Sequence, residues 1–508
     1  MINRRRETCL ASHGPDPAPR ALLSVVRLNY AVLVKPQRLS TALAIVFLAT
    51  AFAWCQSSGP VPFDPQIARG KVVDQLATID DPQQSYALYL PSKYSPDHRW
   101  PVLYVFDPFA RGKTAVEVYQ SAAEKYGYIV VGSNNSKNGP VAEQLEAARI
   151  LWNDTHRRFA IDKDRVYTSG LSGGARVATA FAMYCSTCAV AGVIAHGAGY
   201  PVMQDKKPAN DRFLFYVAIG DEDFNFPEIV ALRRKKESTG APCKVKVYPG
   251  PHQWAPPEIA DDALAWLEVK AMQSGTEKTD PAFVQKQFEA TKAEAAQAAQ
   301  RGDALAQYYA LRELASDFKG LENVAEFEGQ LAQLKDSKAW KTATHNEQRE
   351  IDDQKSLTAT AASELAQLRT AEPDAQTGLA RHIGAVLADL RRQVHSNGRE
   401  RTVSARAFFQ LWIQAIESGQ EEFRNGRMQQ AAAYFELASA ADPDQAWTVV
   451  LLAEAQVRAG NKKAAIKALE EASHRGLRHP EALAQDPELQ PLISDPAFQK
   501  IVQSPPAK

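Results

Sequence analysis

The sequence has little cysteine and no excess of charge of either sign. Only 5 of its 508 residues are cysteines, too few for a fold held together mainly by disulfides. The formal net charge is +0, so the chain lacks the basic surplus of a nucleic-acid-binding protein, and no nucleic-acid partner is expected. Hydrophobic residues make up 45% and charged residues 23%, as in soluble globular proteins, and the length predicts about two to four domains.

Two of the cysteines form the sequence Cys185-Ser-Thr-Cys188. There is no second such pair, so the four ligands of a tetrahedral zinc site are missing. The pair also lies late in a predicted helix, outside the context of a thioredoxin motif. We therefore expect a structural role for both cysteines, as buried thiols or as a disulfide, and no metal site.

One long apolar run lies near the N-terminus, at residues 39–55. It follows basic residues, and Ala51-Phe-Ala53 fits a signal-peptidase cleavage site. The run predicts a signal peptide, with an uncleaved anchor or a lipoprotein cysteine at Cys55 as alternatives. Residues 1–38 would then be a leader or a cytoplasmic tail. The rest of the chain is expected to be periplasmic or extracellular, with membrane contact only through a retained anchor.

Short β-rich runs alternate with helical stretches over residues 62–275. Strands are expected at 86–90, 102–106, 128–132, 166–169, 192–195, 213–219 and 244–248, and helices at 141–159, 173–184, 227–238 and 257–272. Strands that alternate with helices are typical of βαβ units. The fold class predicted here is therefore α/β, with a doubly wound, mostly parallel sheet.

Strand signals disappear after about Gly275, and the remainder reads as helix. Residues 280–400 are expected to be helical, with a polar and partly loose stretch at 341–375. From about residue 405 a 34-residue period is visible: Gly419, Gly426, Ala431, Phe435, Ala438 and Pro443 are followed, 34 residues after the first five, by Ala453, Gly460, Ala465, Leu469 and Ala472. This period predicts tetratricopeptide-like repeats over 405–500. The helices expected at 281–340 could extend the same stack.

The strongest chemical motif is Gly170-Leu-Ser-Gly-Gly174. It stands between a predicted strand and a helix of small residues, which is the context of a nucleophile elbow. Such a turn is tight, and glycines beside the serine avoid clashes with the neighbouring strand and helix. We therefore predict Ser172 as a catalytic nucleophile.

A serine hydroxyl needs a base, and the base needs an orienting carboxylate. The strand expected at 213–219 runs into Gly220-Asp-Glu-Asp223, and the strand at 244–248 runs into Pro249-Gly-Pro-His252. Both loops follow strand carboxyl ends, in the chain order Ser, Asp, His that this kind of fold uses. We predict the triad Ser172, Asp223 and His252, with Asp221 and Glu222 as competing acids.

An oxyanion hole requires two N–H donors. Gly173, directly after the nucleophile, is expected to supply one from its backbone. The loop after the strand at 102–106 should supply the other, from Phe109 or else Ala110, because Pro108 has no N–H. Polar and aromatic residues on the same sheet edge are candidate substrate contacts: Asn134, Asn135, His196 and Trp254. The asparagines could equally cap the following helix, and His196 could equally be a buried core histidine.

Taken together, these motifs resemble the α/β-hydrolase superfamily, in particular esterases similar to polyhydroxybutyrate depolymerases and feruloyl esterases. The resemblance covers residues 66–273 and implies ester hydrolysis through an acyl-enzyme, with no metal or organic cofactor, on a small-molecule or polymer substrate. The chain departs from the family at Asp107-Pro108, where esterases commonly have His-Gly. No long lid insertion is visible, which argues against a lipase.

Two other functions are compatible with the sequence. A prolyl-oligopeptidase-type peptidase would use the same residues, but only about ten residues separate the presumed cleavage site from the hydrolase region, too few for the propeller such enzymes carry. A non-catalytic binding protein would use the repeats, which resemble tetratricopeptide repeats and so imply a possible protein partner. The intact Ser, Asp, His order favours an enzyme over this second alternative.

Overall fold

The computed structural model describes residues 62–201 and 212–504, which lie in one compact unit covering residues 59–508. The signal peptide or anchor predicted at 39–55, and the leader before it, lie outside the described residues. Within the described part, none of the helices combines the length and the apolar character that crossing a membrane requires.

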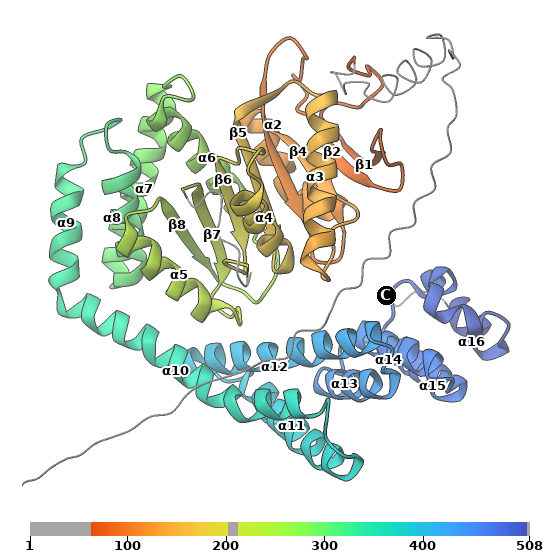
Figure 1. The fold of residues 1–508 in the computed structure, drawn as a ribbon. Helices are drawn as coiled ribbons and strands as arrows, with labels where there is room; N and C mark the ends of the chain where they lie inside the picture. Colours follow the sequence, from red (N-terminus) through yellow and green to blue (C-terminus); the bar gives the residue numbers. More distant parts are fainter. Residues whose placement is uncertain (1–61, 202–211, 505–508) are drawn as a thin grey trace, which may run out of the picture. The chain divides into compact units, whose positions relative to one another are not determined.

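An eight-stranded sheet occupies the first half of the described chain (Figure 1). Its strands are β1 (Val72–Ala77), β2 (Ser85–Tyr89), β3 (Trp100–Phe106), β4 (Ile129–Ser133), β5 (Ile161–Leu171), β6 (Gly192–His196), β7 (Leu214–Gly220) and β8 (Cys243–Tyr248). The spatial order is β1-β2-β4-β3-β5-β6-β7-β8. β2 runs antiparallel to both of its neighbours, β1 and β4. The remaining strands run parallel to one another, from β4 and β3 through β5 to β8. The loops after β3, β5, β6, β7 and β8 therefore meet at one edge, where ligands bind in open α/β sheets.

Helices cover both faces of this sheet. On one face lie α3 (Val141–Arg158), α4 (Gly173–Tyr184) and α5 (Phe226–Thr239), and on the other α2 (Gly112–Tyr126) and α6 (Pro257–Ser274). Because both faces are covered, all seven residues of β3 are buried, as is usual in parallel sheets. The predicted α/β fold is thus confirmed. β1 and α2 were not predicted, because β1 is a half-exposed edge strand without an apolar run and α2 carries charged and small residues around a narrow apolar stripe.

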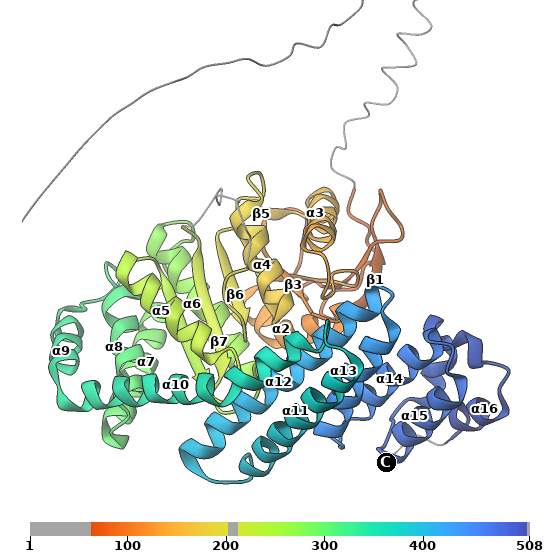
Figure 2. The same ribbon diagram turned by 60° about the horizontal axis from the view of Figure 1, so that its bottom comes forward.

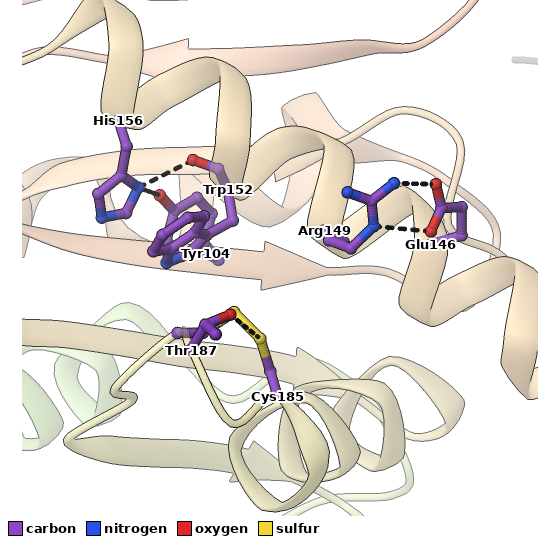
Figure 3. Close-up of a disulfide and its surroundings, with 8 residues drawn as sticks. Tyr104, Glu146, Arg149, Trp152, His156, Cys185 and Thr187 are labelled. Atoms are coloured by element: carbon purple, nitrogen blue, oxygen red, sulfur yellow. Dashed lines mark hydrogen bonds and ion pairs between the residues drawn. A yellow bond between two sulfur atoms is a disulfide. The ribbon is translucent and has the colours of Figure 1, made fainter. Parts of the chain in front are cut away.

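The chain leaves α4 through a disulfide between Cys185 and Cys188 (Figure 3), one of the two structural roles expected for this pair. Above it in the same view, α3 carries a partly buried polar contact. His156 Nδ1 donates to the carbonyl oxygen of Trp152 (2.8 Å) and lies 3.2 Å from the hydroxyl of Tyr104. Burial lowers the pKa of His156, and its contacts link α3 to β3 of the sheet.

The second half is helical, as predicted. α7 (Pro281–Arg301), α8 (Ala304–Asp317) and α9 (Ala325–Asp336) share a core with α6. This core is separate from the core of the repeat helices. A different core joins α10 (Lys338–Gln367), α11 (Pro373–Gln393), α12 (Gly398–Arg424) and α13 (Met428–Ala441).

The expectation of a loose stretch at 341–375 is wrong for most of that stretch. α10 is continuous over 30 residues. Its buried positions recur every three or four residues: Glu347, Ile351, Gln354, Thr358, Ala361 and Leu365. This is regular helical spacing, but half of those side chains are polar, so hydrophobicity alone did not reveal it.

The helices α12 to α15 form two hairpins, with α14 at Ala446–Arg458 and α15 at Lys462–His474. η1 (Pro480–Gln485), η2 (Pro487–Leu492) and α16 (Pro496–Val502) pack against the second hairpin. The small residues of the 34-residue period allow close packing: a Cβ on Gly419 would lie 2.6 Å from the ring of Phe435. A larger residue at this position would therefore force the buried Phe435 ring to shift.

Candidate active site

Ser172 occupies a strained turn between β5 and α4. Its φ of 54° and ψ of −120° lie in a region that side-chain-bearing residues rarely adopt. The turn is held by the backbone, because Ser172 N–H donates to the carbonyl oxygen of His196 at the end of β6 (2.9 Å). This is the geometry of a nucleophile elbow, which presents the serine at the carboxyl edge of the sheet.

The glycines on either side of Ser172 allow the backbone segments to approach closely. A Cβ on Gly170 would lie 2.3 Å from the carbonyl carbon of Gly174, and a Cβ on Gly174 would lie 2.0 Å from the carbonyl oxygen of Phe106. Real Cβ atoms do not tolerate such distances from backbone atoms, so both positions require glycine. The motif read from the sequence is therefore a steric requirement of this turn.

Asp223 and His252 are hydrogen-bonded to each other. Nδ1 of His252 lies 2.8 Å from Oδ2 of Asp223. The Asp223 side chain is fully buried, whereas that of His252 is 11% exposed. The other carboxylate oxygen of Asp223 accepts from the N–H of Asn225 (2.8 Å). An acceptor on Nδ1 keeps the proton there and leaves Nε2 as the basic nitrogen.

Gly197 joins this pair to the nucleophile. It follows His196, whose carbonyl oxygen holds the N–H of Ser172. A Cβ on Gly197 would lie 2.7 Å from Oδ2 of Asp223 and 2.8 Å from Nδ1 of His252. The three predicted residues are thus gathered around one backbone position at the end of β6. The hydroxyl of Ser172 itself has no hydrogen bond to His252, and such contacts commonly form only when a substrate is bound.

Asp221 and Glu222 were weighed as competing acids, and both are engaged elsewhere. The Asp221 carboxylate accepts from the N–H of Gly250 (2.9 Å), so it ties the acid loop to the loop of His252. Glu222 forms an ion pair with Arg401 (3.0 Å). Of the three acids, Asp223 is the one bonded to the imidazole.

The two predicted oxyanion donors differ in their surroundings. Gly173 lines the cavity beside Ser172, at the first turn of α4. Phe109 is 57% exposed, and its N–H donates to the carboxylate of Asp107 (2.9 Å). The N–H of Ala110, the second choice, donates to the Asp107 carbonyl oxygen (3.1 Å). Both backbone donors of this loop are therefore occupied.

The side chain of Asn138 lies beside Gly173 and is a candidate second donor. Asn138 lines the same cavity as Ser172 and Gly173. Its amide is so close to Gly173 that a Cβ there would lie 1.9 Å from Oδ1. Asn138 is held in place by its own N–H, which donates to the carbonyl oxygen of Pro108 (2.8 Å). Asn138 is not among the site residues predicted from the sequence, because the contact depends on how two loops meet.

The other predicted substrate contacts face structural partners. Asn134 donates to Asp74 O and Ser85 Oγ (3.2 and 3.3 Å), and Asn135 bonds the backbone of Gln83 and Ser85. These bonds tie β4 to the β1–β2 hairpin. Neither asparagine lines the cavity beside Ser172.

His196 and Trp254 lie beneath the sheet edge. His196 is fully buried, and its Nε2 lies 2.7 Å from the hydroxyl of Tyr119. Burial lowers the pKa of His196 to about 3. Its ring packs against Trp254, whose indole N–H donates to Asp107 (2.9 Å). Neither side chain lines the cavity, so His196 corresponds to the buried histidine that was the alternative expectation.

α12 closes the space above Ser172. A cavity of about 590 Å³ lies between this helix and the loops of the sheet. From the sheet side it is lined by residues including Asn138, Ser172, Gly173, Arg176 and Phe224, and from α12 by Gln414, Glu417, Ser418, Gln420, Glu421 and Arg424. A volume of this order suits a small-molecule site. The sequence shows no lid inserted within the hydrolase region, but the cover comes from a helix more than 200 residues beyond the nucleophile (Figure 2).

α10 and α12 also hold the loop that carries Asp223. Arg406 is 2% exposed, its Nε donates to the carbonyl oxygen of Asp221 (2.6 Å), and its guanidinium lies 3.8 Å from the ring centre of Phe226. Gln354 of α10 donates to the carbonyl oxygen of Phe224 (2.9 Å). The backbone on both sides of Asp223 is therefore bonded to the helical region.

One family model matches part of the chain. Residues 422–489 match the tetratricopeptide repeat family. No curated protein matches the chain.

Several solved structures are similar to its first half. S-formylglutathione hydrolase from Staphylococcus aureus is 12% identical, with 39% of this chain and 98% of that chain covered and a TM-score of 0.31. A ferulic acid esterase is 20% identical (38% and 94% covered, TM-score 0.30). Butyrate-bound esterase Est2 from Thermogutta terrifontis is 14% identical (40% and 96% covered, TM-score 0.31). Likeness at this level says nothing about the activity of this chain.

Proposed function

We propose that the protein is a serine hydrolase that cleaves carboxylic esters through an acyl-enzyme on Ser172. One observation carries the proposal: the strained serine turn lies beside an Asp223–His252 hydrogen bond of 2.8 Å, both gathered around Gly197. A strained non-glycine residue is costly to keep, by about 1–3 kcal/mol, and such residues cluster at functional sites.

In the proposed reaction, the hydroxyl oxygen of Ser172 attacks the ester carbonyl carbon while Nε2 of His252 takes its proton. Asp223 holds the imidazole in the tautomer with a basic Nε2 and stabilises the imidazolium that forms. The developing oxyanion accepts from the N–H of Gly173 and from the side-chain amide of Asn138. His252 then returns the proton to the departing alcohol, and a water molecule hydrolyses the acyl-enzyme by the same steps.

The deciding experiment is hydrolysis of p-nitrophenyl acetate together with labelling by a fluorophosphonate probe. We expect Ser172→Ala to abolish both, while Ser238→Ala, a change at an exposed serine on α5, leaves both unchanged. Hydrolysis that survives Ser172→Ala would refute the assignment of the nucleophile. A folded wild-type protein that neither hydrolyses the ester nor reacts with the probe would favour a non-catalytic binding protein.

Two finer points belong to this proposal. Export is supported by the apolar run at 39–55 with its Ala51-Phe-Ala53 site, and N-terminal sequencing of the mature protein should begin at Trp54. A small or polymeric ester is the expected substrate, and a protein partner for the repeats is supported by the family match over 422–489. Peptidase activity is the second candidate and predicts cleavage of a chromogenic proline peptide, which an esterase would leave intact.

A further inference from the structure

The side of α12 that faces Ser172 is polar. Gln414, Glu417, Ser418, Glu421 and Arg424 are spaced three or four residues apart, so they lie on one side of the helix. The residues between them on α12 include buried apolar side chains such as Ala415 and Ile416. Glu417, Glu421 and Arg424 in this stripe are exposed and line the cavity beside Ser172, so a ligand that enters the cavity can contact them.

Two acidic side chains belong to this stripe, and they differ in their partners. Glu421 forms an ion pair with Arg369 (2.5 Å). In the described part of the chain, Glu417 has neither a hydrogen bond nor an ion pair at contact distance. Its carboxylate interacts only through space with Arg176, His252 and Arg424, and the surrounding protein raises its pKa. Glu417 is therefore an unpaired carboxylate in the catalytic cavity.

The arginines near Glu417 do not form an ion pair with its carboxylate. Arg176 binds both carboxylate oxygens of Glu228 (2.9 and 2.7 Å), so its charge is already balanced. Arg424 is seven residues further along α12, about 10 Å along the helix axis. A cation carried by a ligand can approach Glu417 more closely than either arginine.

An aromatic ring completes the arrangement. Phe224 lines the same cavity, and its ring centre lies 4.4 Å from that of His252. Aromatic faces attract amines and quaternary ammonium groups, especially together with a carboxylate. Phe224 thus places an aromatic ring next to the catalytic imidazole, in the cavity that Glu417 also lines.

We propose that this cavity takes an ester with a positively charged amine or ammonium group, recognised by the Glu417 carboxylate and the Phe224 ring. The inference rests on the proposed function, since it assigns a substrate class to the same site. Glu417 acts on specificity and takes no part in proton transfer.

Binding to the Ser172→Ala protein tests this without hydrolysis. Acetylcholine and its uncharged isostere 3,3-dimethylbutyl acetate have nearly the same shape and differ in a single charge. By titration calorimetry we expect the cationic ester to bind at least about tenfold more tightly, the scale of one charge contact. Adding Glu417→Gln should remove this preference. Adding Glu421→Gln is the matched control and should keep it within about twofold, because that carboxylate is already paired.

Equal affinity for the two esters, no binding of the cationic ester at millimolar concentration, or a preference that survives Glu417→Gln would each overturn the inference. These outcomes are distinct from failure of the proposed function. A charge preference that depends on Glu417, in a protein whose Ser172 neither hydrolyses esters nor reacts with a fluorophosphonate, would support the binding site and refute the enzyme. Hydrolysis of both esters, at a rate ratio that Glu417→Gln does not alter, would support the enzyme and refute the proposed binding site.

Discussion

Replacing Arg406 with methionine should weaken catalysis from outside the hydrolase domain. Methionine keeps much of the apolar stem that packs near Phe226 but removes the guanidinium. The change leaves the carbonyl oxygen of Asp221 without its buried donor, which costs about 1.5–3 kcal/mol for a charged hydrogen bond. Loss of the contact with the Phe226 ring adds about 1 kcal/mol. Burial of the guanidinium lowers the pKa of Arg406, which reflects the cost of keeping a cation there. Methionine removes this cost, which offsets part of the lost stability.

The expected net destabilisation is about 2 kcal/mol. Because Asp221 begins the loop of Asp223, we expect kcat to fall about 10- to 100-fold with little change in KM. The pH profile of hydrolysis should also change, because the Asp223 carboxylate is held less firmly. The measurements are urea unfolding and the pH dependence of p-nitrophenyl ester hydrolysis. Arg401→Gln is the matched control: it removes an ion pair to the same loop, but the Arg401 side chain is 52% exposed, so the cost should stay below about 1 kcal/mol.

The positioning role of Arg406 is refuted if Arg406→Met loses stability but keeps kcat and the pH profile. It is also refuted if Arg401→Gln lowers kcat as much. Either result would mean that the contact holds the two regions together without orienting Asp223.

Three further changes test other parts of the site. Gly197→Ala should lower kcat at least about tenfold, because its Cβ would push apart the Asp–His pair; Gly240→Ala has the same left-handed backbone with nothing within 4 Å and should leave kcat unchanged. Asn138→Ala should lower kcat by about 10²-fold or more with little effect on KM, as for loss of one oxyanion donor; an unchanged kcat would return that role to Phe109. The third concerns pH: with its pKa held at about 3, His196 stays neutral in the fold but gains a proton on unfolding below about pH 6.5. The contribution of the neutral His196 to the free energy of unfolding is therefore complete above that pH and falls by about 1.4 kcal/mol per pH unit below it. Between pH 7 and pH 5, urea unfolding of the wild type should lose about 2 kcal/mol more free energy than that of His196→Gln. Equal losses would contradict this prediction.

Local patterns were sufficient for much of the fold. The strand before Ser172 and the helix after it could be predicted because β-branched and aromatic residues give way abruptly to glycines and alanines, and α4 begins and ends where expected. β1 could not be predicted, because an edge strand pairs through its backbone and needs no apolar run. α10 was missed over most of its length because its buried side includes the polar residues Glu347 and Gln354, which bond Arg233 and the carbonyl oxygen of Phe224.

The sequence by itself determined the residues that meet at the sheet edge, since every strand of a parallel sheet delivers its following loop to the same side. It placed Ser172, Asp223 and His252 in three such loops, and the glycines around Ser172 follow from local sterics. Only the tertiary structure decided what covers that edge. Contacts between Arg406 and the loop of Asp223, and between α12 and the cavity, join positions more than 180 residues apart. No local periodicity encodes such contacts, because they depend on how whole helices pack.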